Sequence, residues 1–200
     1  MNDKTGPSLL IVLSGPSGAG KGTLSKLLLK DMPNIYYSVS ATTRLKRNGE
    51  VEGRNYFFIE EDSFKEMIEK GEFLEWANVY GNYYGSPKEN VKKQLEIGRD
   101  VLLEIDIQGA LQIKRQLPEG VFVFIVPPSI NELKRRIEKR GTDTKDVIEK
   151  RMESVYEELN YVTEYDYVVI NDDLESAMEK LRAIIIAEKC RSHRRKIDIN

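Results

Sequence analysis

Short apolar segments alternate with amphipathic ones almost from one end of the chain to the other. The apolar segments are dense in aliphatic and β-branched residues, which is typical of strands that are covered on both faces. The predicted strands are Leu9–Ser14, Val101–Asp106, Val121–Val126 and Tyr167–Ile170. The predicted helices, which carry apolar residues at helical spacing, are Lys21–Lys30, Gln108–Gln116, Ile130–Arg140, Lys145–Thr163 and Leu174–Cys190. This alternation predicts an α/β fold with a central parallel sheet and helices on both faces.

Two polar stretches interrupt the alternation. Thr43–Ser86 is rich in Gly, Tyr and Arg, and it predicts short strands with one helix, Asp62–Lys70, which Gly71 ends. Lys134–Arg151 is crowded with cations. We expect both stretches to be insertions over the ends of the sheet.

A glycine-rich loop follows the first predicted strand directly. In "GPSGAGKGT" the glycines allow the backbone to turn its N–H groups inward, and the next helix adds its positive N-terminal dipole. Lys21 would supply a mobile charge for the β- and γ-phosphates of a nucleotide. A plain flexible turn is the alternative, but the strand before the loop and the amphipathic helix after it favour a phosphate-binding loop. The expected nucleotide contacts are Gly15, Pro16, Ser17, Gly18, Ala19, Gly20, Lys21, Gly22 and Thr23.

Gly22 stands where a Ser or Thr hydroxyl would be expected to reach Mg²⁺. Because Mg²⁺ bound to nucleotides keeps several waters, the loss of one protein hydroxyl is tolerable. We expect Thr23 to hydrogen-bond an α-phosphate oxygen instead.

Charge and cysteine content narrow the class of protein. The 31 Lys and Arg residues against 33 Asp and Glu residues give a formal charge of −2, which disfavours nucleic acid as a partner. Cys190 is the single cysteine, so no intramolecular disulfide is possible and a reducing compartment is expected. Apolar runs such as Leu9–Leu13 are too short to span a bilayer, and the N-terminus lacks the shape of an export signal. These features predict a cytoplasmic protein without a membrane partner; they do not decide between a monomer and a homo-oligomer.

Three motifs together resemble the guanylate kinase family. They are the glycine loop, "SVSATTRLKRNGEVEGRNYFF" (Ser38–Phe58) and "FLEWANVYGNYYGS" (Phe73–Ser86), and the similarity continues into "RIEKRGTDT" and "VVINDD". The resemblance implies ATP-dependent phosphorylation of GMP, and of dGMP, with Mg²⁺ on a three-layer P-loop fold. It implies one domain with a core (about residues 1–40, 91–133 and 153–200), a mixed α/β GMP-binding region (about 41–90) and a helical lid (about 134–152).

The resemblance assigns four residues of the polar insertion to the phosphate of GMP. They are Arg44, Arg47, Tyr56 and Tyr84. A nucleoside monophosphate presents a dianionic group that Arg can grip through two hydrogen bonds, and tyrosine hydroxyls can donate to it as well. The alternative is solvated loop arginines and packing tyrosines. Lys46 stands where the family usually has a proline, which affects the stiffness of the loop but not the groups that bind.

Glu75 is the candidate for reading the base. Guanine offers two adjacent donors, N1–H and the 2-amino group, and one carboxylate can accept both. The two-residue period of a strand places Leu74 and Trp76 on one face and Glu75 on the other, so a buried aromatic face would leave Glu75 toward a cleft. An exposed glutamate is the alternative. The resemblance adds Ser40 and Ser86 as further contacts to the base.

Further residues come from the cationic stretch and the strand ends. The resemblance implies that Arg136, Arg140 and Arg151 close on ATP and, with Lys21 and Arg44, neutralise the transferring phosphoryl group; solvated surface charges are the alternative. Asp106 is expected near the acceptor and the Mg²⁺, which it would bind through water, unless it merely caps a helix. Asn171 resembles a family position near adenine. His193, the only histidine, lies in a basic tail and is not expected to be catalytic.

Three other functions fit parts of the pattern. Another nucleoside monophosphate kinase would use AMP or UMP, and turnover of each monophosphate separates these cases. A non-catalytic module that binds phosphorylated proteins typically lacks a working phosphate loop, whereas the glycines and Lys21 are intact here. A GTPase switch would read guanine with an "NKxD" segment, which the sequence does not contain.

Overall fold

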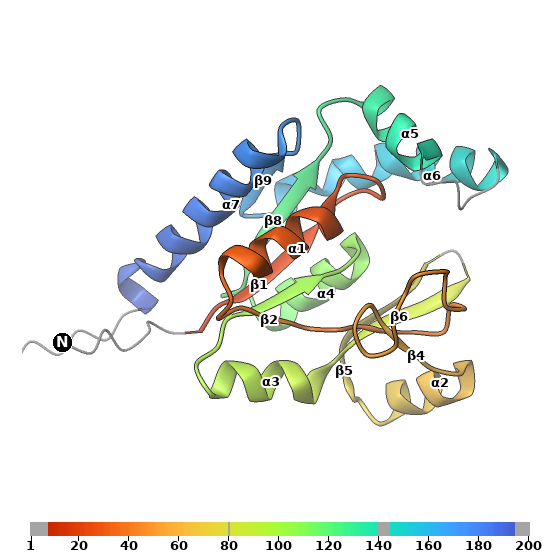
Figure 1. Ribbon diagram of the computed structural model, residues 1–200. Helices are drawn as coiled ribbons and strands as arrows, with labels where there is room; N and C mark the ends of the chain where they lie inside the picture. The colour runs from red at the N-terminus through yellow and green to blue at the C-terminus, as the bar shows by residue number, and fades with distance from the viewer. Residues whose placement is uncertain (1–7, 80, 140–144, 195–200) are drawn as a thin grey trace, which may run out of the picture.

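The computed structural model describes residues 8–79, 81–139 and 145–194, and their strands form two sheets (Figure 1). The larger sheet has the order β2-β7-β1-β8-β9, and every neighbouring pair in it is parallel. Its strands are β1 (Leu10–Ser14), β2 (Tyr36–Tyr37), β7 (Val101–Glu104), β8 (Val121–Val126) and β9 (Tyr167–Ile170). The predicted parallel sheet is therefore confirmed. Strand β2 was not predicted, because two residues are too short to show a period.

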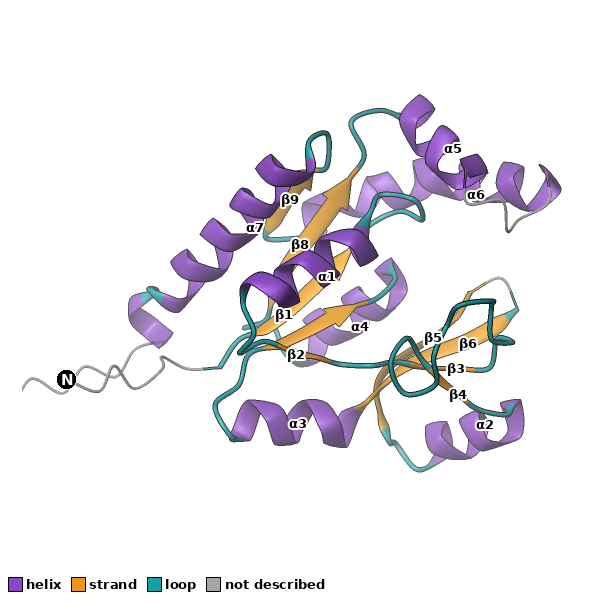
Figure 2. Ribbon diagram, viewed as in Figure 1, coloured by secondary structure: helices purple, strands orange, loops and turns teal. Residues whose placement is uncertain are grey.

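Helices cover both faces of this sheet (Figure 2). They are α1 (Lys21–Asp31), α3 (Lys88–Glu96), α4 (Ile107–Gln116), α6 (Lys145–Leu159) and α7 (Leu174–Lys189), whereas α5 (Ile130–Lys139) packs against α6. The α-helix predicted to run to Thr163 ends at Leu159 and continues as a 3₁₀ turn, Asn160–Glu164. Among the described residues, no helix combines the length and the apolar character that crossing a bilayer requires.

The strand predicted to end at Asp106 ends two residues earlier, at Glu104. Asp106 belongs to the next element, since its carboxylate accepts the Gly109 N–H at 2.8 Å and caps α4. An acidic N-cap satisfies a backbone donor that the first helical turn leaves unpaired, which explains why the chain leaves the sheet here.

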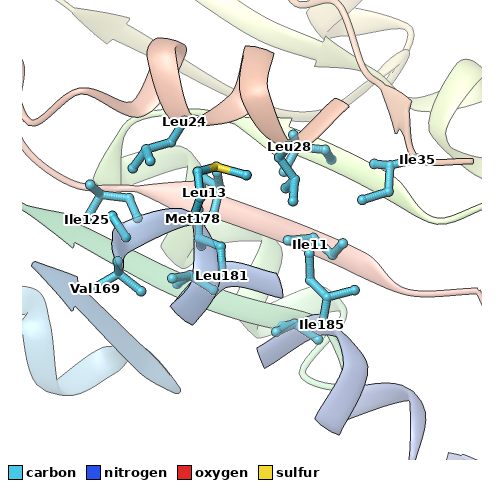
Figure 3. Packing of buried hydrophobic residues seen from close by; sticks show 14 of the residues in the cluster. Ile11, Leu13, Leu24, Leu28, Ile35, Ile125, Val169, Met178, Leu181 and Ile185 are labelled. Carbon is cyan, nitrogen blue, oxygen red and sulfur yellow. The ribbon is translucent and has the colours of Figure 1, made fainter. Parts of the chain in front are cut away.

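Alternate residues of β1 enter two separate cores. Ile11 and Leu13 pack on one face of the sheet against Leu24 of α1 and Leu181 of α7 (Figure 3). Residues on the opposite face, among them Val12, contact α3 and α4. All five residues of β1 are buried, which accounts for its unbroken apolar sequence.

The polar insertion forms the second sheet, with the order β4-β3-β6-β5. Its elements are β3 (Ala41–Thr42), β4 (Phe57–Phe58), α2 (Glu61–Glu69), β5 (Phe73–Val79) and β6 (Asn82–Pro87). Phe64 of α2 stacks on Phe73 of β5, with ring centroids 4.3 Å apart, and both side chains are buried. A separate small core thus holds this region together, and the predicted short strands and single helix are present.

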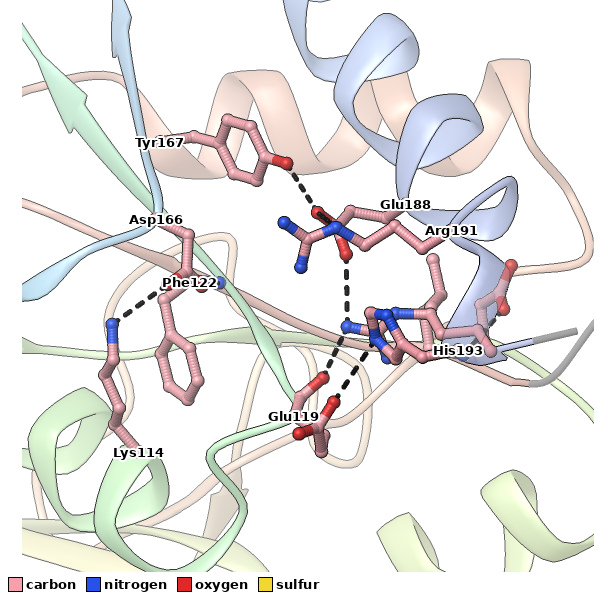
Figure 4. Close-up of polar contacts among 11 residues, drawn as sticks. Lys114, Glu119, Phe122, Asp166, Tyr167, Glu188, Arg191 and His193 are labelled. Atoms are coloured by element: carbon pink, nitrogen blue, oxygen red, sulfur yellow. Dashed lines mark hydrogen bonds and ion pairs between the residues drawn. The ribbon is translucent and has the colours of Figure 1, made fainter.

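Polar contacts hold the carboxyl-terminal end of α7 next to the amino end of β8 (Figure 4). The buried Glu188 carboxylate accepts hydrogen bonds from the Tyr167 hydroxyl (2.5 Å) and from Arg194 Nη2 (3.1 Å). Arg194 also donates to the Glu119 carbonyl oxygen at 2.7 Å, and His193 Nε2 lies 3.5 Å from the Glu119 carboxylate. The single histidine therefore lies at the opposite end of the sheet from the glycine loop.

Candidate active site

A cavity of about 280 Å³ lies between the carboxyl ends of the central strands and the second sheet. It brings together most of the predicted contacts from the glycine loop and the insertion. The predicted residues that line it are Gly15, Ser17, Gly18, Gly20, Lys21, Gly22, Ser40, Arg44, Arg47, Tyr56, Glu75, Tyr84 and Asp106. The lining residues that sequence reasoning missed are Glu50, Val79, Glu104, Ile105, Ile107 and Glu158. Both halves of the predicted site therefore face one space.

The glycine loop leaves β1 and ends at the first turn of α1. Gly15 and Gly20 have φ values of 132° and 96°, which residues with a Cβ rarely adopt. A Cβ on Gly15 would lie 2.1 Å from the Ile125 carbonyl oxygen. Lys21 Nζ donates to the carbonyl oxygens of Gly15 (2.5 Å) and Pro16 (3.1 Å), so the lysine lies along the loop. Thr23 is exposed and does not line the cavity.

Asn171 supports the loop from outside the cavity. This residue is buried, and its Nδ2 donates to the Ala19 carbonyl oxygen at 2.8 Å. A Cβ on Gly20 would lie 2.2 Å from the same nitrogen. The resemblance implied a contact with adenine; the observed contact is with the backbone of the loop itself.

Replacing Asn171 by Ala should lower the free energy of unfolding by about 1–3 kcal/mol, because the Ala19 carbonyl loses its buried partner. We expect the dissociation constant for ATP to rise several-fold while the KM for GMP changes little. Denaturant unfolding and titration with ATP measure the two effects, and Asn34→Ala at an exposed site is the control. Unchanged ATP affinity would show that the contact does not hold the loop.

Aromatic side chains surround Arg44 at the predicted phosphate site. Its guanidinium carbon lies 5.5 Å from the centroid of the Tyr56 ring, and the Tyr56 and Tyr84 rings meet edge-on at 5.8 Å. Burial raises the pKa of Tyr56 to about 12. The Tyr56 hydroxyl therefore keeps its proton at neutral pH and can donate to an anion. Arg47 lines the cavity from a more exposed position.

Glu50 holds Arg44 in place and was not predicted. Arg44 Nη2 and Nη1 donate to the two carboxylate oxygens of Glu50 at 2.7 and 3.1 Å. The Arg47 backbone N–H donates to the same carboxylate at 2.7 Å. Burial acts to raise the pKa of Glu50, but these donors lower it overall. The arginine that a phosphate would need is thus oriented by a carboxylate six residues away.

Glu75 is buried, with 4% of its surface exposed, and its carboxylate faces the cavity. The Ser86 hydroxyl, fully buried, donates to Glu75 Oε1 at 2.7 Å. Burial raises the pKa of Glu75 to about 7, and the charge of Asp106 adds to the increase while the Ser86 hydroxyl opposes it. Ser86 therefore contacts the Glu75 carboxylate and does not itself line the cavity.

The prediction that Trp76 lies on a buried aromatic face is wrong. Trp76 is 38% exposed, while Leu74 and Glu75 are both buried. The pairing of β5 with β6 shifts between Phe73 and Glu75, and a bulge of this kind breaks the strict alternation of faces. Glu75 reaches the cavity as predicted, but by a different local geometry.

Glu104 and Asp106 bring two carboxylates to the cavity next to Lys21. Burial raises the pKa of Asp106, although the Gly109 N–H and the Lys21 charge act in the opposite direction. A Cβ on Gly22 would lie 3.3 Å from Glu104 Oε1. This carboxylate therefore lies next to the position from which a Ser or Thr hydroxyl would project. Asp106 caps α4 and also lines the cavity, while its expected contacts with the acceptor and with Mg²⁺ stay a prediction.

The structure describes only some of the three arginines that were predicted to form a lid. Arg136 Nε donates to Glu132 at 2.8 Å and its Nη2 to the Asn171 carbonyl oxygen at 3.1 Å, and it does not line the cavity. Arg140 and the side chain of Arg151 lie outside the described residues. Convergence of the three arginines on a nucleotide stays a prediction.

Comparisons with known proteins identify the family of this chain. The guanylate kinase family model matches residues 8–188. The chain is 63% identical over 188 residues to a guanylate kinase of Caldanaerobacter subterraneus subsp. tengcongensis, covering 94% of this chain and 91% of the relative. It is 56% identical over 187 residues to one of Desulfitobacterium hafniense, covering 94% of each. The crystal structure of guanylate kinase from Anaplasma phagocytophilum matches with a TM-score of 0.81 and 35% identity, covering 96% of this chain and 90% of that one. The chain belongs to the guanylate kinase family.

Proposed function

We propose that the chain transfers the terminal phosphoryl group of ATP to GMP between the two halves of the cavity. Phosphoryl transfer to GMP is the function of the family to which it belongs. The glycine loop and Lys21 would hold the triphosphate, and the Arg44 group would hold the phosphate of GMP. The observation that carries these roles is the buried Glu75 carboxylate, which faces the same cavity as Lys21.

Positioning and charge neutralisation suffice for this reaction. The attacking phosphate oxygen of GMP is already anionic, so no strong general base is needed. The cavity must align two polyanions, and it offers Lys21, Arg44 and Arg47 as cations for them. In our proposal Arg136, Arg140 and Arg151 join from the lid when both nucleotides are bound.

The choice of guanine follows from Glu75. An ionised carboxylate can accept the N1–H and 2-amino donors of guanine together, whereas adenine presents an acceptor at N1 and no 2-amino group. A buried carboxylate left facing an acceptor loses its hydrogen bonds, and such sites discriminate strongly. Ser40 lines the same cavity and Ser86 donates to Glu75, so both support this side of the site.

We propose that Glu104 and Asp106 hold Mg²⁺ together with the phosphates of ATP. Among the described residues no group of three or more His, Cys, Asp or Glu side chains could bind a metal alone. Two carboxylates beside the loop fit Mg²⁺, which takes one or two carboxylates, waters and substrate phosphates in such sites. When bound, the ion would supply charge stabilisation for the transferring group. The three-region division of the domain, the tolerance for dGMP and a cytoplasmic location stay predictions from the sequence.

A coupled assay of ADP release tests the proposal. ATP and Mg²⁺ are supplied with GMP, dGMP, AMP or UMP in turn, and turnover should be fast with the guanine nucleotides alone. Faster turnover with AMP or UMP would favour another monophosphate kinase. No turnover with any of them, despite GMP binding, would favour a non-catalytic binding module.

Binding of GMP should release a proton near neutral pH. The pKa of Glu75 is raised to about 7 in the free protein, so a large fraction of the carboxyl carries a proton, while acceptance of two guanine donors requires the ionised form. The affinity for GMP should therefore fall by up to about tenfold for each pH unit below 7. Titration calorimetry at pH 7 in buffers of different ionisation enthalpy measures the number of protons that are released when GMP binds. Equal apparent enthalpies in all buffers would contradict the expectation.

A further inference from the structure

The outer edge of β5 faces a helix instead of another strand. β5 is the last strand of the four-stranded sheet, and its other neighbour is α4, which belongs to the core (Figure 2). The backbone groups on a strand edge need partners just as those in the middle of a sheet do. Here the partners come from side chains.

Two glutamines of α4 supply these partners on either side of Glu75. Gln112 Oε1 accepts the Trp76 N–H at 3.3 Å, and Gln112 Nε2 donates to the Trp76 carbonyl oxygen at 2.7 Å. A single amide side chain thus makes the pair of bonds that a residue of a neighbouring strand would make. Gln116, one turn further along, donates from Nε2 to the Leu74 carbonyl oxygen at 3.2 Å.

Gly109, on the same face of α4, leaves space for the Glu75 carboxylate. A Cβ at this position would lie 2.3 Å from Glu75 Oε2 and 2.9 Å from its carboxyl carbon. Positions 109, 112 and 116 are three and four residues apart, so they share one face of α4. The Glu75 carboxylate therefore lies directly against the first turn of the helix, between the backbone groups that the glutamines hold.

We infer that Gly109, Gln112 and Gln116 form a positioning stripe that fixes Glu75 relative to the phosphoryl-transfer site and so sets the preference for guanine. The inference rests on the proposed role of Glu75. Asp106 caps the same helix and lines the cavity, so α4 connects the base-reading carboxylate to the reacting end. A carboxylate that is free to turn could satisfy other bases, whereas one held in place discriminates by geometry.

The test compares GMP with IMP, which keeps N1–H but lacks the 2-amino group. Gln112→Met keeps the length of the side chain and removes both hydrogen bonds. We expect it to lower kcat/KM for GMP by about tenfold, since each bond is near the surface and worth a modest amount. The ratio of kcat/KM for GMP to that for IMP should fall, and the dissociation constant for ATP should stay unchanged. Gln94→Ala is the control, because Gln94 lies on α3 and accepts a 3.3 Å hydrogen bond from Arg99 instead.

Gly109→Ala tests the stripe without weakening the helix. Alanine has a higher helix propensity than glycine, so the substitution should not lower the melting temperature by weakening α4. The added methyl should displace Glu75 and raise the KM for GMP; because it would also lie 3.2 Å from Asp106 Oδ1, ATP affinity is judged from Gln112→Met instead. If both variants keep the wild-type GMP:IMP ratio, the stripe does not position Glu75 and the inference is wrong.

Glu75→Gln distinguishes failure of the inference from failure of the proposed function. If that variant also keeps the GMP:IMP ratio, Glu75 does not read the base. The other outcome is that Glu75→Gln removes the preference for GMP over IMP while Gln112→Met and Gly109→Ala keep it. In that case the role of Glu75 stands and only the positioning stripe is refuted.

Discussion

Replacing Glu75 by Gln should lower kcat/KM for GMP by about a hundred- to a thousandfold, with ATP affinity unchanged. Each hydrogen bond to a charged group contributes about 1.5–3 kcal/mol, and the amide keeps one acceptor but turns a donor toward the guanine donors. Steady-state kinetics with GMP and a separate titration with ATP measure the two quantities. Equal losses for GMP and ATP would refute the assignment. Glu72→Gln, an exposed position just before the same strand, is the matched control.

The same variant should stabilise the protein without nucleotide above pH 7. The pKa of Glu75 in the folded protein is about 7, raised from 4.5. Burial of the carboxyl therefore costs no folding stability at low pH, and the free energy of unfolding falls as the pH rises from 4.5 to about 7. A neutral amide removes this penalty. Thermal unfolding at pH 5 and pH 8 should show a gain in melting temperature at pH 8 and little change at pH 5. A gain that does not depend on pH would point to packing rather than to ionisation.

Replacing Lys21 by Met should reduce kcat by about a hundred- to a thousandfold. A preorganised donor at the transferring group is worth about 2.7–4 kcal/mol in a site that excludes water. The variant removes the hydrogen bonds from Lys21 to Gly15 and Pro16, but we expect the loop to persist because its glycine geometry and the Asn171 contact remain. Single-turnover kinetics measure the chemical step directly.

Lys26→Met on the exposed side of α1 is the control for the loss of one charge. It should leave kcat near the wild-type value, since Lys26 does not line the cavity. If Lys21→Met and Lys26→Met turned over equally fast, the lysine would have no role in transfer.

Features with a strong local signal were predicted from the sequence. The parallel sheet follows from unbroken apolar strands, and the glycine loop from its strand–loop–helix context. The exposure of Trp76 was missed because a bulge is set by the pairing of two strands, which no period within β5 records. The end of β7 was missed because Asp106 satisfies a helix donor three residues ahead.

Residues that act through distant partners were the hardest to predict. Glu50 and Gln112 are ordinary charged and polar positions in the sequence, and only the fold places one on Arg44 and the other on the Trp76 backbone. Glu104 had a weak signal, since it shares the strand that precedes Asp106. Its place beside Gly22 depends on the pairing of β1 with β7.

The ion pair between Glu50 and Arg44 has a consequence for small anions in the surrounding solution. A carboxylate tethered six residues away is present at a high effective concentration, so inorganic phosphate or sulfate must compete with it for the guanidinium. A nucleotide that also engages Glu75 gains the extra binding energy that such competition requires. If GMP binds as proposed, we therefore expect free phosphate to occupy the Arg44 site only weakly.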